Sequence, residues 1–230
     1  MELKMRAGHR GTGPGAITRD GCAVELYSRL PVRGEPDVIA AAVPPGSRIL
    51  ELGCGVGRMT HPLVARGFTV TVVDESPEML DRVRGARTVC APIEGLDLGE
   101  TFDVVLLASC LVHAGDVEVR RALLRTCVGH LAPDGCVLIQ REGEGWHTDV
   151  PRERVDPHGY TFRVVSAEPV GDGVNSVHAV YEFPDATWTQ TFLARPLTRP
   201  QFEAALAETG LRVDAYLTDD RTWVRAVRAA

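Results

Sequence analysis

Three glycines at alternate positions, together with one aspartate further along the chain, are the residues best suited to bind a small ligand. Gly53, Gly55 and Gly57 follow a short apolar run, and Asp74 closes the next apolar run. A loop of glycines between a strand and a helix allows a bulky ligand to approach the backbone. A carboxylate at the end of the neighbouring strand can accept hydrogen bonds from the two hydroxyls of a ribose. The spacing therefore predicts a site for a nucleoside.

The exact glycine pattern excludes two common phosphate sites. A dinucleotide-binding loop of the form G-x-G-x-x-G would place its third glycine at position 58, which is Arg58 here. The chain also lacks the Gly-Lys-Ser/Thr ending of a P-loop. Glu51 precedes the first glycine, and a carboxylate there would attract an ammonium group and repel a phosphate. These residues favour a nucleoside that carries an amine rather than a pyrophosphate.

Strands and helices that position this loop alternate between residues 48 and 140. The predicted strands are nearly all apolar, which is typical of a parallel sheet with helices on both faces. Helix-start signals include Ser76 followed by Pro77, and Asp116. The predicted strands span residues 49–52, 68–73, 88–90, 102–108 and 136–140, and the predicted helices include 58–66, 77–84 and 117–131.

The pattern changes after Arg141. Residues 160–170, 175–183 and 187–193 are rich in Val, Thr and aromatic residues and are separated by hairpin turns. We expect a three-stranded antiparallel insert, over about residues 159–195, inside one domain that spans residues 21–230. The rest of that domain is predicted as a helix at 198–209 and a closing hairpin at 211–217 and 222–227. Residues 1–20 are predicted to be a flexible N-terminal tail.

Composition and charge restrict the partners and the compartment. The chain has 230 residues and a formal net charge of −6, and Lys4 is its only lysine. The arginines are dispersed, so nucleic acid is disfavoured as a substrate. No apolar run is long enough to span a bilayer, and the N-terminus lacks the apolar segment of a secretory signal. The six cysteines form no C-x-x-C pair and show no metal-ligand spacing, so we expect a cytoplasmic protein without structural disulfides, metal or membrane partner.

Four segments in order carry a resemblance to a known family. Residues 49–57 resemble the first motif of class I S-adenosylmethionine-dependent methyltransferases. Residues 72–74 resemble the second-strand acid of that family, and residues 76–80 its "SxxML" helix start. Residues 102–105 resemble the beginning of its fourth strand. The closing hairpin also fits the antiparallel last strand of the family.

The resemblance implies an α/β fold and a cofactor. The fold would be a doubly wound, mostly parallel seven-stranded Rossmann-like sheet with an antiparallel last strand and a small antiparallel β insert. The cofactor would be S-adenosyl-L-methionine, and the product S-adenosyl-L-homocysteine. The residues expected at the cofactor are Tyr27, Glu51, Gly53, Cys54, Gly55, Gly57, Asp74, Glu75, Ser76, Met79, Ile93, Glu94 and Ala108.

Two of these contacts leave alternatives open. The family aspartate that binds the adenine amino group is replaced by Pro92, so Glu94, a backbone carbonyl or a water would take that group. Ile93 would still pack on the adenine face. Tyr27 would close over the methionine part of the cofactor, or pack its helix against the core.

Methyl transfer is an in-line displacement in which the protein mainly aligns and desolvates the reactants. A phenol acceptor needs a base, whereas a neutral amine does not. His113 is the candidate base because it lies just past the strand at 102–108; the alternative is a hydrogen-bonded structural histidine. The predicted acceptor-pocket residues, which could instead form a lid or an interface, are Trp146, His147, His158 and Tyr160.

The predicted function is therefore methylation of a small-molecule acceptor at oxygen or nitrogen. The stretch after Cys110 lacks the [DN]-P-P-[YF] motif of methyltransferases that act on base amino groups. By resemblance the chain is a metabolic or natural-product enzyme of a bacterium, either a monomer or a homodimer. Two alternatives remain: a non-catalytic protein that binds adenosylmethionine, and a nucleotide-dependent oxidoreductase, which Arg58 disfavours.

Overall fold

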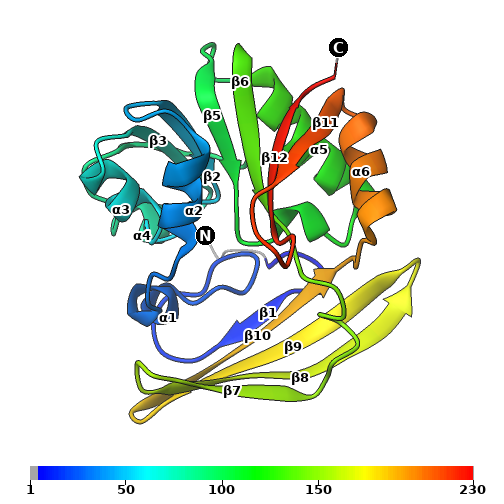
Figure 1. Ribbon diagram of the computed structural model, residues 1–230. Coiled ribbons are helices and arrows are strands. Elements are labelled where there is room, and N and C mark those ends of the chain that lie inside the picture. The colour runs from blue at the N-terminus through cyan, green and yellow to red at the C-terminus, as the bar shows by residue number, and fades with distance from the viewer. Residues whose placement is uncertain (1–4, 230) are drawn as a thin grey trace. The chain divides into compact units, whose positions relative to one another are not determined.

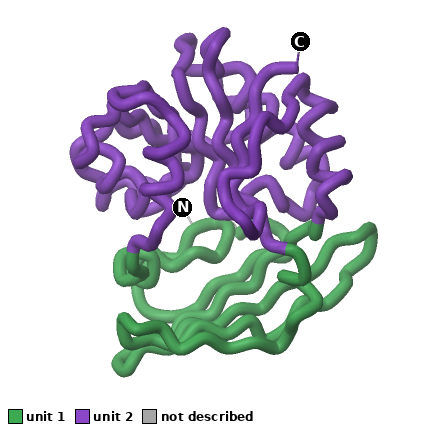
Figure 2. The backbone as a smooth tube through the Cα atoms, in the orientation of Figure 1, with its two compact units in different colours: residues 1–31, 144–196 green, residues 32–143, 197–230 purple. Residues whose placement is uncertain are grey.

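The computed structural model describes residues 5–229, which form two compact units (Figure 2). Unit 1 combines the described part of Met1–Pro31 with Glu144–Pro196. Unit 2 combines Val32–Gly143 with the described part of Leu197–Ala230. Each unit thus combines two segments that are distant in the chain, and the single domain over residues 21–230 stays a prediction.

Unit 2 contains a seven-stranded sheet in the order β11-β12-β6-β5-β2-β3-β4 (Figure 1). The five strands from β6 to β4 in this order are parallel, and β12 and β11 are added as an antiparallel pair. The predicted Rossmann-like fold class is confirmed. The strands are β2 (Arg48–Leu52), β3 (Thr69–Asp74), β4 (Arg87–Cys90), β5 (Phe102–Leu107), β6 (Leu131–Gln140), β11 (Leu211–Tyr216) and β12 (Trp223–Arg228).

The helices of unit 2 begin where the sequence has capping residues. Ser76 accepts a hydrogen bond from the Met79 amide, and Asp116 accepts one from Glu118. The helix predicted to reach residue 84 is short and ends at Leu80. The helical segments are α2 (Glu35–Ala42), α3 (Thr60–Ala65), α4 (Pro77–Leu80), the 3₁₀ turn η1 (Leu111–His113), α5 (Val117–Gly129) and α6 (Arg199–Ala207).

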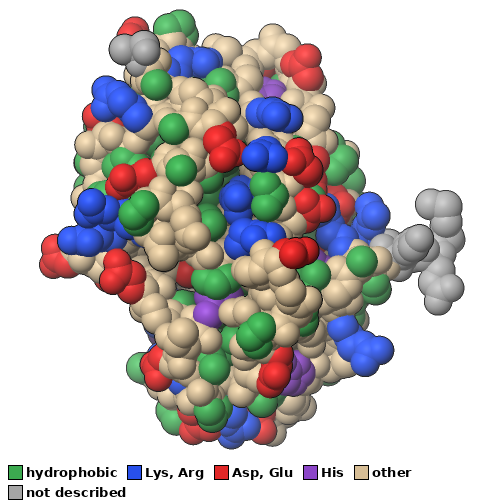
Figure 3. Space-filling view, turned by 90° about the vertical axis from the view of Figure 1, so that its right-hand side faces the viewer, with side chains coloured by type: hydrophobic (Ala, Val, Ile, Leu, Met, Phe, Trp, Pro, Cys, Tyr) green, Lys and Arg blue, Asp and Glu red, His purple; other side chains and the backbone are tan. Residues whose placement is uncertain are grey.

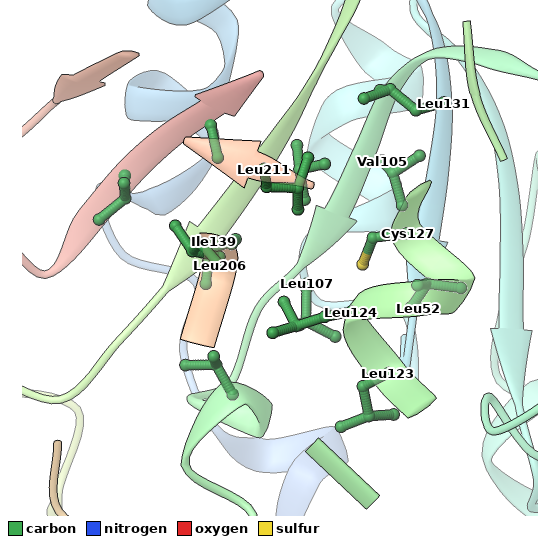
Figure 4. Close-up of a cluster of buried hydrophobic side chains, with 14 of the residues drawn as sticks. Leu52, Val105, Leu107, Leu123, Leu124, Cys127, Leu131, Ile139, Leu206 and Leu211 are labelled. Atoms are coloured by element: carbon green, nitrogen blue, oxygen red, sulfur yellow. The ribbon is translucent and has the colours of Figure 1, made fainter. Parts of the chain in front are cut away.

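Two hydrophobic clusters cover the two faces of this sheet. One joins side chains of the central strands to α5 and α6, as Figure 4 shows for Leu107, Leu124 and Leu206. The other joins alternate residues of the same strands, such as Ile49, to α2 and α3. Because successive side chains point to opposite faces, burial on both faces requires the nearly all-apolar strands seen in the sequence.

Unit 1 contains a five-stranded antiparallel sheet in the order β1-β10-β9-β8-β7 and one short helix. Trp188 is fully buried, packs with Leu26 of the helix, and donates its indole N–H to Pro14 O at 2.9 Å. The elements are β1 (Arg10–Thr12), α1 (Val24–Arg29), β7 (Arg152–Asp156), β8 (Tyr160–Gly171), β9 (Val174–Phe183) and β10 (Ala186–Ala194).

The sheet of unit 1 is larger than the three-stranded insert that the sequence predicts. Residues 10–12, expected within a flexible tail, form β1 and pair with residues 189–191 of β10. The remaining edge strand is β7, whose polar sequence gave no strand signal. Residues 1–4 of the predicted tail lie outside the described residues.

The surface carries both signs of charge. Acidic and basic side chains are intermixed over the face that Figure 3 displays. Within residues 5–229, no helix is both long enough and apolar enough to cross a membrane. The same residues include no group of three or more His, Cys, Asp or Glu side chains that could hold a metal ion.

Candidate active site

The glycine loop leaves β2 and folds against the end of β3. The backbone N–H groups of Gly53 and Cys54 both donate to Val73 O, at 2.8 and 3.1 Å. Gly53, Gly55 and Gly57 all have positive φ, at 72°, 55° and 84°. Residues with a side chain rarely adopt positive φ, so the backbone conformation of this loop favours glycine at all three positions.

The three glycines differ in the space around them. A Cβ on Gly53 would lie 2.8 Å from Leu111 Cδ1, and one on Gly57 would lie 2.9 Å from the His61 ring. On Gly55 the nearest atom would be Met79 Sδ at 3.9 Å. Gly53 and Gly57 therefore allow the protein to pack on itself. A Cβ on Gly55 would only be in ordinary van der Waals contact with Met79, and Gly55 is half-buried, so its backbone is the part of the loop that a ligand can approach.

Asp74 is held rigidly at the end of β3. Its Oδ2 accepts a hydrogen bond from the Gly55 amide at 2.8 Å, and its Oδ1 accepts one from the Ser76 amide at 2.9 Å. Each carboxylate oxygen has two lone pairs, so each can also accept a hydroxyl hydrogen. Buried Met79 lies below the loop in α4. The structure thus brings together Gly55, Asp74, Ser76 and Met79, and their contact with a cofactor stays a prediction.

Glu51 is a buried acid on β2 beside the loop. It is 2% exposed, and Thr60 of α3 donates its hydroxyl to Oε2 at 2.7 Å. Burial raises the pKa of Glu51 to about 7, and Asp74 adds to the rise, while the Thr60 hydrogen bond and Arg58 oppose it. Near neutral pH this carboxyl is therefore partly protonated.

We expect the affinity of this site for an ammonium-bearing ligand to depend on pH through Glu51. Between pH 6 and 7.5 the ionised fraction rises from about 0.1 to about 0.75, so binding should tighten several-fold. Since the pKa is raised in the folded state, the same ionisation opposes folding, and the free energy of unfolding should fall over that window. Titration calorimetry with S-adenosylhomocysteine at several pH values measures the first effect. Glu51→Gln should remove both dependences, and a pH-dependent affinity that persists in this variant would contradict the assignment.

The predicted adenine end lies between β4 and β5. Ile93 is next to the glycine loop, since its Cδ1 would be 3.6 Å from a Cβ on Gly53. Its carbonyl accepts the Thr126 hydroxyl of α5 at 2.8 Å, which fixes the loop. Pro92 is exposed and Glu94 is half-buried. The contact to the adenine amino group stays a prediction.

His113 is buried in η1 and bonded to Glu142 through both ring nitrogens. The Glu142 backbone N–H donates to Nε2 at 3.0 Å, so the neutral ring carries its proton on Nδ1, which lies 3.2 Å from the Glu142 carboxylate. His113 is 3% exposed. In this conformation it could accept a proton from a substrate only after giving up the bond from the Glu142 amide. Its predicted role as a base stays a prediction, and the geometry favours the alternative of a structural histidine.

A strained turn follows β5 and was not anticipated from the sequence. Ala108, an expected cofactor residue, is buried at the end of the strand. Ser109 and Cys110 then both have positive φ, at 53° and 57°. The Ser109 N–H donates to Gln140 Oε1 at 2.9 Å. Neither residue type signals such a turn, and Gln140 is 31 positions further along the chain.

The remaining predicted residues lie in unit 1 and divide into separate groups. Trp146 and His147 contact each other with ring centroids 4.8 Å apart, and Tyr160 stacks on Phe183 at 4.8 Å. His158 is exposed in the turn after β7. Tyr27, in α1, accepts a hydrogen bond from the Cys22 thiol at 3.4 Å. Their roles toward an acceptor or cofactor stay predictions.

Fold and site together define a Rossmann-like domain in which a glycine loop lies beside a fixed aspartate at the carboxyl ends of the parallel strands. Residues 49–135 match the profile of a family described as a methyltransferase domain. Residues 49–135 are thus matched as a methyltransferase domain, which confirms the resemblance that the motifs carry.

Curated relatives match the chain over this region. A ubiquinone biosynthesis O-methyltransferase from Caulobacter sp. (strain K31) is 34% identical over 108 residues, which cover 41% of this chain and 40% of the relative. Nodulation protein S from Rhizobium tropici is 29% identical over 109 residues, which cover 44% of this chain and 46% of the relative. The chain thus matches less than half the length of these relatives.

Solved structures match over most of their length. A methyltransferase from Clostridium acetobutylicum ATCC 824 superposes with a TM-score of 0.71 at 15% identity, covering 89% of this chain and 95% of that one. The CcbJ methyltransferase from Streptomyces caelestis gives 0.72 at 18% identity, covering 90% and 96%. CalS10, an amino pentose methyltransferase from Micromonospora echinaspora with adenosylmethionine bound, gives 0.65 at 24% identity, covering 91% and 93%. These likenesses concern the fold.

Proposed function

We propose that this chain transfers the methyl group of S-adenosylmethionine to a small-molecule acceptor. One observation carries the proposal: the Asp74 carboxylate is fixed by the Gly55 and Ser76 amides, directly beside the half-buried backbone of Gly55. That arrangement suits the vicinal hydroxyls of a ribose and close approach of the group attached to it.

The bound cofactor would supply a methyl group on a sulfonium, from which the neutral thioether of S-adenosylhomocysteine is a good leaving group. Asp74 would hold the ribose hydroxyls, and Glu51, in its ionised form, would balance the ammonium group. Ile93 would pack on the adenine. The protein's contribution is then alignment of the acceptor in line with the methyl group and exclusion of water.

The acceptor is inferred to be a small molecule that is methylated at oxygen or nitrogen. The names of similar proteins support this class: a ubiquinone biosynthesis O-methyltransferase, a sugar N-methyltransferase and a glycopeptide N-methyltransferase. The engaged nitrogens of His113 favour a neutral amine, because that acceptor needs no base in the transition state.

The test has two stages. Titration calorimetry with S-adenosylhomocysteine should give one bound equivalent, and no detectable binding would overturn the proposal. Turnover is then measured as release of S-adenosylhomocysteine from adenosylmethionine with a panel of phenols, amines and carboxylates. Binding without turnover on any member would instead favour a non-catalytic adenosylmethionine-binding protein.

We further propose a cytoplasmic location and a monomeric or homodimeric state. The six cysteines, all within the described residues, are free thiols, which suits a reducing compartment. The net charge of −6 supports a partner other than nucleic acid. Sedimentation equilibrium would decide between monomer and dimer.

A further inference from the structure

The turn after β5 is held in an unfavourable backbone conformation by three hydrogen bonds. Ser109 and Cys110 both adopt the left-handed region, which is uncommon for residues other than glycine and concentrates at functional sites. The Leu111 amide donates to Ala108 O at 3.2 Å, and the His113 amide donates to Cys110 O at 2.9 Å. The third bond runs from the Ser109 amide to the Gln140 side chain at 2.9 Å.

This third bond fixes which way the Gln140 amide points. A backbone N–H can only donate, so the Gln140 atom that faces Ser109 must be the oxygen. The Nε2 atom, with its two N–H donors, must then face the other way. None of the described residues accepts a hydrogen bond from Nε2, and the side chain is only half-buried.

Gln140 lies at the same sheet edge as the glycine loop. Leu52 pairs with Leu107 across β2 and β5, and Leu107 pairs with Ile139 across β5 and β6. The next residue of each strand or its loop therefore lies in one row at the sheet edge: Gly53, Ala108 and Gln140. Two strand spacings, about 10 Å, separate Gly53 from Gln140. The edge formed by the carboxyl ends of parallel strands is where ligands bind in open α/β sheets.

The Gln140 side chain also lies on the same face of the sheet as Glu51. Gln140 lies two positions after Leu138 and therefore shares its face of the sheet, and Leu138 packs in the cluster on the α3 side. Glu51 lies on this side too, because it bonds to Thr60 of α3. Between them stands Ala108, a small buried residue of the same cluster. Gln140 therefore presents two donors toward the same region as the loop.

We propose that Gln140 selects acceptors that carry a neutral oxygen, a hydroxyl or a carbonyl, next to the atom that is methylated. Its Nε2 hydrogens donate to that oxygen and so orient the neighbouring nucleophile. This inference rests on the proposed methyl transfer and names the substrate class of that site.

The electrostatics of the turn favour a neutral partner over an anion. Burial raises the pKa of the Cys110 thiol most, the Glu142 carboxylate raises it further, and Arg141 opposes this by less, so a second negative charge is disfavoured there. An amide donor supplies direction without charge, which suits a hydroxyl or carbonyl oxygen better than a carboxylate.

The test compares probe pairs that differ only by the neighbouring oxygen: catechol with phenol, and trans-2-aminocyclohexanol with cyclohexylamine. Each probe is titrated into ¹⁵N-labelled protein saturated with S-adenosylhomocysteine. The Gln140 side-chain signals are identified as the pair that is missing in Gln140→Glu. We expect these signals to shift, and the probe with the neighbouring oxygen to bind roughly fivefold to tenfold more tightly in at least one pair.

Gln140→Glu keeps an oxygen for the Ser109 amide and loses both donors, so it should abolish the preference. Gln140→Met is the second variant, and thermal unfolding of both variants shows whether they fold. Gln201→Glu, on the exposed capping box of α6, is the matched control and should change nothing. A preference that survives in folded Gln140→Glu, or Gln140 signals that none of the four probes shifts, would overturn the inference. Failure of S-adenosylhomocysteine to bind would overturn the proposed function instead, and the probes titrated into the protein alone would still report on Gln140.

Discussion

Replacing Asp74 with alanine should weaken the binding of S-adenosylhomocysteine by about 1.5–3 kcal/mol, roughly 10- to 150-fold in the dissociation constant. The variant loses the acceptors proposed for the ribose hydroxyls. It also leaves the Gly55 and Ser76 amides without the oxygens that fix the glycine loop. Titration calorimetry at pH 7.5 gives the affinity directly.

Asp103→Ala is the matched control for this experiment. Asp103 also accepts a backbone N–H, that of Arg48 at 2.8 Å, but it is exposed at the amino-terminal ends of β2 and β5, the sheet edge opposite the glycine loop. It should retain the wild-type affinity. Equal affinities of Asp74→Ala and the wild type would show that the ribose is held elsewhere.

Replacing His113 with alanine should lower the free energy of unfolding by about 3 kcal/mol. The Glu142 carboxylate is buried and bonded to the ring at 3.2 Å, and its amide donates to the same ring. Removal of the imidazole leaves an acid and an N–H in the interior without these partners and opens a cavity. Urea unfolding followed by circular dichroism measures the change.

His130→Ala separates the effect of the carboxylate from that of a buried ring. His130 is equally buried and accepts the Leu98 amide at 3.0 Å, but its other nitrogen bonds to the Thr126 carbonyl, which is uncharged. Its loss should therefore be smaller. If His113→Ala unfolds like the wild type yet loses turnover, the histidine is a base rather than a structural residue.

Much of unit 2 could be predicted because its signals are local. Apolar runs, the capping residues Ser76 and Asp116, and the glycine spacing are each written within a few positions of the chain. Gly55 and Asp74 come from consecutive strands of a parallel sheet, so their proximity follows from the topology.

The features of the fold and site that could not be predicted depend on contacts between distant segments of the chain. Glu142 meets His113 from 29 positions away, and the direction of the Gln140 amide depends on a turn that ordinary residues seldom form. β1 and β7 are short and polar, and they become strands only because β10 and β8 offer them edges. Patterns within a single segment contain none of this information.

The discontinuity of both units constrains how the chain can be divided or synthesised. Unit 1 receives β1 and α1 from the beginning of the chain and its other strands from residues 144–196, whereas unit 2 ends with β11 and β12. During translation, the sheet of unit 1 is complete only when residue 194 of β10 has left the ribosome. The sheet of unit 2 is complete only when residue 228 of β12 has done so. Cutting the chain at a single point would therefore separate at most one intact unit, and isolation of unit 2 would require removal of the first segment and a short linker in place of residues 144–196.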